Sequence, residues 1–249
     1  ADSGTHTASW TDTAIRLTVS KLTDITFGPS SANGWASRTF YVTNVPLATS
    51  KLPQVANTVF TYGGELAASK WFSLVDSSLN SNHPDNTKRA NNPCIYGATA
   101  ASLEDSTHTG AIQASGTKTV TIPMDTLLDA SKLYALCYAE TNGLTTDTTW
   151  RDSYMRLTMS KVQSVSSLSV THYIEGQLVN HAAVSLTYHG SLAASNYISL
   201  VDQTYNSHYP CNSAAVAAAG SDSTHTGALQ GSGTKVTTFS STGMDASKM

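Results

Sequence analysis

Charged residues are scarce in this chain. Asp, Glu, Lys and Arg together make up 12% of the 249 residues, and the formal net charge is -3. Proteins that bind nucleic acid or anionic membranes carry clustered basic side chains, so the composition predicts neither partner. The sequence also has no run of 18 apolar residues, and we therefore expect no membrane-spanning helix.

Residue types that serve catalysis are few as well. Glu occurs only at positions 65, 104, 140 and 175, so the paired carboxylates of a glycosidase are hard to assemble. The Gly-x-Ser-x-Gly turn that positions a hydrolase serine is missing. We therefore predict that the protein is not an enzyme and uses no cofactor. The Asn-x-Ser/Thr acceptor is missing too, so N-glycosylation through that signal is not expected.

Ser and Thr, in contrast, are abundant and form roughly 28% of the chain. Such a composition occurs in disordered, glycosylated stalks. Here, however, the hydroxyl side chains alternate with Val, Ile, Leu, Phe, Tyr and Trp, and Thr itself is a β-branched residue that favours strands. The pattern therefore predicts a folded protein rich in strands.

The chain contains a long internal repeat. One fourteen-residue phrase occurs twice with two differences, as DSTHTGAIQASGTK at 105–118 and DSTHTGALQGSGTK at 222–235. The match extends towards the N-terminus, where YGGELAASKWFSLVD at 62–76 corresponds to YHGSLAASNYISLVD at 188–202. Repetition on this scale is typical of stacked structural units.

A third match joins the beginning of the chain to its middle. WTDTAIRLTVSKL at 10–22 corresponds to WRDSYMRLTMSKV at 150–162. The second copy of the long unit stops at DASKM, before any counterpart of the YALCY segment of the first copy. The two chain ends thus flank a gap of about five residues in one repeat, and we expect both to cut through a domain, whereas natural boundaries fall in linkers.

Several segments alternate apolar and polar residues with the period of two that marks half-buried strands. Ile15, Leu17 and Val19 share one face of the segment at 10–22, as Met155, Leu157 and Met159 do in the segment at 150–162. Many short strands with turn signals between them predict a β-sandwich.

The segment LDASKLYALCYAE, at 128–140, resembles the corner and the central strand of immunoglobulin-like and fibronectin-III-like sandwiches. It has a turn with Asp129, then Tyr134, then Cys137 on a strand. The resemblance implies a buried Trp on an early strand, for which Trp71 is the candidate.

We therefore predict an all-β protein with two tandem immunoglobulin-like β-sandwich repeats. A last-strand segment at 1–21 precedes a complete repeat at 22–161, and the second repeat, at 162–249, lacks its last strands. The spare last strand at the N-terminus is then a donor for another copy or the end of a preceding repeat.

Three cysteines fit this organisation. Cys94 and Cys137 lie in the first repeat and form its natural pair, while Cys211 is the copy of Cys94 and its partner would lie outside the chain. The alternatives are three buried, reduced cysteines, or a zinc site, for which no paired-cysteine spacing occurs. A disulfide indicates an oxidising compartment, and we expect the protein at the cell surface or outside the cell.

An unfinished sandwich exposes backbone groups that another strand can pair with. The segment at 10–22 supplies such a strand, with Trp10, Ile15, Leu17 and Val19 as its inserting residues, as in donor-strand complementation. The chain resembles subunits of extracellular β-sandwich fibres. We expect it to bind copies of itself head-to-tail, as a homopolymer, or adjacent repeats of one long polypeptide.

The sequence also suggests that glycans are attached to the protein or bound by it. Loops dense in Thr provide candidate O-glycan sites, and ordinary hairpin chemistry is the alternative; the candidates are Thr5, Thr7, Thr145, Thr146, Thr148 and Thr149. The alternative function is a cell-surface adhesin or carbohydrate-binding stalk of tandem repeats. Its sugar-stacking platform would consist of aromatic side chains that otherwise fill the core, namely Trp35, Trp71, Tyr62 and Tyr188.

The repeated DSTHTG phrase places Asp105 before His108 and Asp222 before His225. A metal site or a general base is the functional interpretation. One Asp and one His are too few ligands, so we favour a turn in which Asp and Thr cap backbone amides and His lies on the surface.

Overall fold

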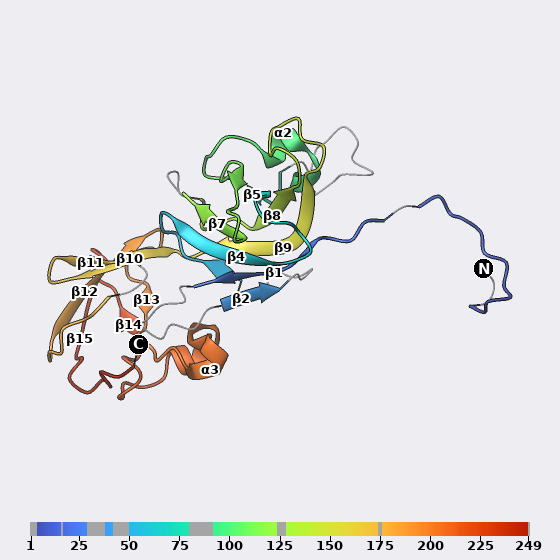
Figure 1. The fold of residues 1–249 in the computed structure, drawn as a ribbon. Coiled ribbons are helices and arrows are strands. Elements are labelled where there is room, and N and C mark those ends of the chain that lie inside the picture. The colour runs from blue at the N-terminus through green and yellow to red at the C-terminus, as the bar shows by residue number, and fades with distance from the viewer. Residues whose placement is uncertain are drawn as a thin grey trace.

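The computed structural model describes residues 4–15, 17–28, 38–41, 50–79, 92–123, 128–173 and 176–248. Strands dominate these residues, and the helices among them are turns of three or four residues. The strands form several sheets that are largely antiparallel (Figure 1). The prediction of an all-β protein is confirmed. Trp35, a candidate for the sugar-stacking platform, lies outside the described residues.

The first sheet has four antiparallel strands. In spatial order they are β2 (Arg38–Tyr41), β1 (Leu22–Phe27), β4 (Thr58–Gly64) and β7 (Thr119–Ile122). Alternation decides which side chains face inward. Phe60 and Val120 are at most 1% exposed, whereas Val59, beside Phe60 in β4, is 44% exposed.

The second sheet has five strands. In spatial order they are β3 (Lys51–Leu52), β9 (Arg151–Met159), β8 (Tyr134–Ala139), β5 (Trp71–Asp76) and β6 (Ile112–Gln113). β3 runs parallel to β9, and the other neighbours are antiparallel. β8 is buried at every residue because β5 and β9 cover both of its edges and an apolar cluster lies on each face.

The two sheets share one apolar core. Side chains of β1, β4 and β7 meet side chains of β5, β8 and β9 in a single buried cluster. Phe60 of one sheet packs edge to face against Phe72 of the other, with 6.0 Å between the ring centroids. Burial of an apolar side chain of this size contributes about 1.5–3 kcal/mol, so this cluster is the main source of stability in the first repeat.

A smaller cluster covers the opposite face of the second sheet. The turns η1 (Pro93–Ile95) and α2 (Gly97–Ala100) place Cys94 and Ala100 against this face. Trp150 is fully buried in the same cluster and donates a hydrogen bond from Nε1 to the Leu144 carbonyl at 3.0 Å. Trp71, the tryptophan expected to be buried, is the first residue of β5 and packs against the same cluster, but it is only partly buried.

The second repeat begins with an equivalent antiparallel sheet. In spatial order its strands are β11 (Val170–His172), β10 (Val162–Ser167), β12 (Val184–Gly190) and β15 (Val236–Phe239). β13 (Tyr197–Ile198) and β14 (Leu229–Gln230) form a separate pair. The turns of this repeat are α3 (Tyr205–His208), η2 (Pro210–Asn212) and α4 (Ala214–Ala217).

The strands of the second repeat follow the order of the first. β10, β11, β12 and β15 correspond to β1, β2, β4 and β7, while β13 and β14 correspond to β5 and β6. Within the described residues, the second repeat has no counterpart of β8 or β9. The two repeats touch, since Gln163 donates from Nε2 to Gln54 Oε1 at 3.1 Å and the Arg38 guanidinium lies 5.4 Å from the Tyr209 ring centroid.

Candidate functional site

The segment at 10–19 is an exposed copy of a buried strand. In its counterpart, formed by Trp150 and β9, the residues Trp150, Met155, Leu157 and Met159 lie in the interior, each at most 2% exposed. The corresponding apolar row of the N-terminal segment is exposed: Trp10 71%, Ile15 67%, Leu17 89% and Val19 91%. None of the described residues at 4–21 belongs to a helix or strand, and this segment extends away from the sheets (Figure 1).

The N-terminal segment shares one backbone bend with β9. Ala14 has φ 58° and its counterpart Tyr154 has φ 64°, both in the left-handed region that non-glycine residues seldom adopt. The Asp two residues earlier stabilises each bend: the Ala14 amide donates to Asp12 Oδ1 at 2.8 Å, and the Tyr154 amide to Asp152 Oδ1 at 2.7 Å. The same bend thus forms with or without a neighbouring sheet.

The second repeat has an open edge where the first is closed. β5 pairs with β6 on one side and with β8 on the other, and Leu74 and Val75 are at most 1% exposed. In the second repeat, β13 pairs with β14 alone among the described residues. The counterparts Leu200 and Val201 are only partly buried as a result.

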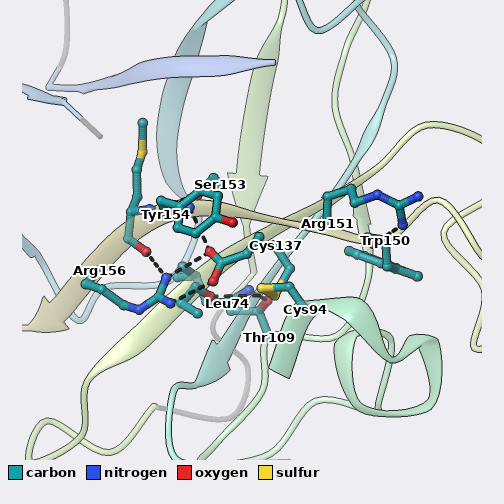
Figure 2. Close-up of a disulfide and its surroundings, with 12 residues drawn as sticks. Leu74, Cys94, Thr109, Cys137, Trp150, Arg151, Ser153, Tyr154 and Arg156 are labelled. Atoms are coloured by element: carbon teal, nitrogen blue, oxygen red, sulfur yellow. Dashed lines mark hydrogen bonds and ion pairs between the residues drawn. A yellow bond between two sulfur atoms is a disulfide. The ribbon is translucent and has the colours of Figure 1, made fainter. Parts of the chain in front are cut away.

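The predicted disulfide joins Cys94 to Cys137 and connects η1 to β8 (Figure 2). The bond spans 43 residues of sequence, and a loop of that length stabilises the folded state by about 4 kcal/mol on the chain-entropy account. Cys211 occupies the position of Cys94 in the turn η2, but it is exposed and free.

Tyr134 anchors the corner that leads into β8. Its hydroxyl donates to the Ser106 carbonyl at 2.7 Å and to the Asp129 carbonyl at 3.1 Å. Tyr134 itself is fully buried, and desolvation raises the pKa of its phenol. The corner therefore joins the repeated DSTHTG turn to the central strand through one side chain.

The repeated DSTHTG turn has the same geometry in both repeats. The Thr107 amide donates to Asp105 Oδ1 at 2.6 Å, as the Thr224 amide donates to Asp222 Oδ1 at 2.7 Å. Burial opposes ionisation of Asp105, but hydrogen bonds from Thr107 and His108 outweigh it and lower the pKa of Asp105 to about 2. Hydrogen bonds from Thr224 and His225 likewise lower the pKa of Asp222 to about 2.

The expected surface position of the two histidines is wrong. His108 is 7% exposed and His225 is 5% exposed, and the backbone of each forms a β-bridge, to Val75 and Val201 respectively. Nδ1 of each ring lies 3.0–3.1 Å from the Asp carboxylate of its turn. Among the described residues, no group of three or more His, Cys, Asp or Glu side chains is arranged to hold a metal ion.

The threonine-rich loop before β9 is organised by Asp147. Its carboxylate accepts hydrogen bonds from the Asn142, Gly143 and Thr149 amides at 2.7–2.9 Å. Burial opposes ionisation, but the hydrogen bonds from Thr149, Asn142 and Gly143 lower the pKa of Asp147 to about 2. The Thr149 hydroxyl also donates to Asp147, at 2.6 Å.

The other threonines of the two loops are more accessible. Thr145, Thr146 and Thr148 are exposed and line an open cavity of about 540 Å³ together with Tyr96 and Arg151. In the N-terminal segment Thr5 and Thr7 are exposed, with their hydroxyl oxygens 3.2 Å apart. These five threonines are thus exposed, whereas Thr149 is only partly exposed and its hydroxyl donates to Asp147.

Of the aromatic residues expected to form a sugar-binding platform, the two tyrosines are buried, and Trp71 is partly buried. Tyr62 is 4% exposed and Tyr188 is fully buried. Their hydroxyl groups donate to the Ala67 and Ala193 carbonyls at 2.6 and 2.8 Å. Both rings therefore fill the cores of their repeats.

No family model, curated protein or solved structure matches this chain. Its candidate site therefore rests on the comparison of its two repeats with each other. The described residues contain no helix that is long and apolar enough to cross a membrane.

Sequence reasoning found the apolar row and the disulfide, but it missed two features. The bend at Ala14 was not foreseen, although Asp12 two residues earlier is its signal. The burial of Trp150 in the same cluster as the disulfide was also missed. A tryptophan stands at the start of both copies of the segment, as Trp10 and as Trp150, and this repetition could have indicated that Trp150 is buried.

Proposed function

We propose that this protein is a structural subunit of an extracellular filament, whose copies join head-to-tail by sharing β-strands between successive immunoglobulin-like sandwich repeats. One observation carries the proposal. The same apolar row is buried in β9 and 67–91% exposed in the segment at 10–19. A soluble chain gains no stability from such a row unless another surface covers it.

Burial of the exposed row supplies free energy for assembly. Burial of a large apolar side chain contributes about 1.5–3 kcal/mol, so the four residues Trp10, Ile15, Leu17 and Val19 together supply roughly 6–12 kcal/mol before the cost of association. Main-chain hydrogen bonds at a sheet edge add register and specificity. The bend at Ala14 is already formed, which reduces the ordering cost on binding.

The geometry of the contact favours a filament over a closed dimer. The donor segment and the accepting repeat are different surfaces of one chain, so the contact is heterologous and propagates unless rotation closes a ring. Two versions remain within the proposal: separate copies joined without covalent bonds, or adjacent repeats of one longer polypeptide. In both, a segment like 10–19 completes a repeat like the second one.

Two further observations support an extracellular setting. The Cys94–Cys137 disulfide is stable in oxidising compartments. The exposed hydroxyls of Thr5, Thr7, Thr145, Thr146 and Thr148 are accessible to O-glycosylation. The carbohydrate-binding alternative is weaker, because two of its aromatic side chains are buried.

Electron microscopy of the purified chain tests the proposal. We expect regular fibres from the wild-type chain and dispersed particles from the double variant Leu17→Ser/Val19→Ser, which removes the most exposed part of the row. Val59→Ser is the matched control, because Val59 is an exposed apolar residue outside the row, and it should still form fibres. Dispersed wild-type particles that bind glycans would favour the adhesin alternative.

A further inference from the structure

The first repeat shows how a strand such as β9 is held at its outer edge. β3 pairs with β9 in parallel, with Lys51 opposite Thr158 and Leu52 opposite Met159. The Thr158 amide donates to the Ser50 carbonyl at 2.9 Å, and the Ser160 amide donates to the Leu52 carbonyl at 2.8 Å. This ladder is independent of β8, which pairs with the other edge of β9.

The second repeat contains the counterpart of β3 but no strand beside it. Aligned through the shared LAAS and SLVD segments, residues 176, 177 and 178 correspond to 50, 51 and 52. The described residues at 176–180 belong to no strand. Leu178 packs against the cluster of Val184 and Leu186 but is only partly buried, whereas its counterpart Leu52 is 0% exposed. Part of Leu178 is therefore accessible to a further apolar side chain.

The connection from the N-terminal segment to β1 contains the same turn as the connection from β9 to β10. The Leu22 amide donates to Ser20 Oγ at 3.2 Å, as the Val162 amide donates to Ser160 Oγ at 3.2 Å. With the shared bend at Ala14, the segment thus matches β9 at two points, one inside the strand and one just after it. These matches favour the same lateral neighbour for the segment as for β9.

We propose that residues 17–20 of one copy add in parallel to residues 176–178 of a second copy, with Thr18 beside Gln177 and Val19 beside Leu178. This assignment rests on the filament proposal and specifies the partner strand, the direction and the register. Val19 then covers Leu178, as Met159 lies beside Leu52 in the first repeat. The Thr18 and Ser20 amides donate to the carbonyls of residues 176 and 178.

The register predicts which engineered cysteines can form a disulfide. In a background with Cys211→Ser, chains with Thr18→Cys are mixed with chains carrying Gln177→Cys under mild oxidation. Each variant has a single new cysteine, so a mixed disulfide can only form between copies. Non-reducing gels and mass spectrometry of the linked peptides measure its yield. We expect the mixed disulfide as the main covalent product of the fibres.

Val179→Cys is the matched control for register. A slip of two residues moves the two Cα atoms to about 8 Å apart, beyond disulfide range, so Thr18→Cys with Val179→Cys should give about tenfold less product. Fibres that link equally through Val179, or that link through neither site, would overturn the register and leave strand sharing intact. If the Cys211→Ser parent stays dispersed and no mixed disulfide forms, both proposals are wrong.

Discussion

At the scale of single residues, one device recurs through the chain. Among the residues that the structure describes, seven aspartates each accept hydrogen bonds from the amide and the hydroxyl of the Ser or Thr two residues later; they are Asp76, Asp105, Asp129, Asp147, Asp202, Asp222 and Asp245. Such a turn needs only local contacts. This explains why Asp-x-Ser/Thr could be recognised in the sequence, where the DSTHTG phrase was assigned to a turn of this kind.

Asp147 allows a test of this device, because its carboxylate is nearly buried and accepts hydrogen bonds from three amides. Asp147→Ala leaves these amides without an acceptor, and we expect the free energy of unfolding near neutral pH to fall by about 1–3 kcal/mol. The pKa of Asp147 in the folded protein, about 2, lies below the ordinary value of 3.8. Its contribution is therefore present above about pH 4 and is lost as the pH falls towards about 2.

Denaturant unfolding at several pH values measures both effects. The wild type should lose more stability than Asp147→Ala between about pH 4 and pH 2, because the variant has no carboxylate to protonate there. Asp245→Ala is the matched control, since Asp245 forms the same turn at an exposed position. It should lower the free energy of unfolding by less than Asp147→Ala does. Parallel pH profiles for the wild type and Asp147→Ala would contradict this account.

At the scale of elements, periodicity predicted the strands that alternate and missed those that do not. β4 and β9 follow the period-two pattern, because one face of each lies on the core. β8 is buried on both faces, so its sequence YALCYA carries no alternation, and it was located through the corner with Tyr134. β3 is two residues long, which is too short for any periodic signal, so its parallel pairing with β9 could not be foreseen.

Leu17 and Leu157 occupy the same place in two copies of one element. Leu157 is 1% exposed and Leu17 is 89% exposed. In the unassembled chain we expect Leu157→Ala to lower the free energy of unfolding by about 2–5 kcal/mol, and Leu17→Ala to change it by less than about 0.5 kcal/mol. Urea unfolding below the assembly concentration measures the difference. An equal loss for Leu17→Ala would show that the N-terminal segment folds onto its own chain.

At the scale of the whole molecule, the same joint occurs twice. The Lys21 carbonyl accepts the Leu66 amide at 3.1 Å at the start of the first repeat, and the Lys161 carbonyl accepts the Leu192 amide at 3.0 Å at the start of the second. If a neighbour accepts the segment at 10–19 in the position of β9, successive repeats follow one another across copies as they do within the chain. A filament then has one joint repeated throughout, whether or not the backbone continues across it.

Cys211 reports on how that joint is made. The donor segment contains no cysteine, and Cys211 is exposed and free, so strand addition leaves it unpaired. We expect fibres assembled from this chain to dissolve in denaturant without reductant into chains of 26.3 kDa, each with one thiol that reacts with maleimide. Cys211→Ser should abolish labelling and still form fibres. Dimers linked through Cys211 would contradict strand addition as the sole joint. Native filaments that lack the free thiol and whose chains have a larger mass would identify one long polypeptide.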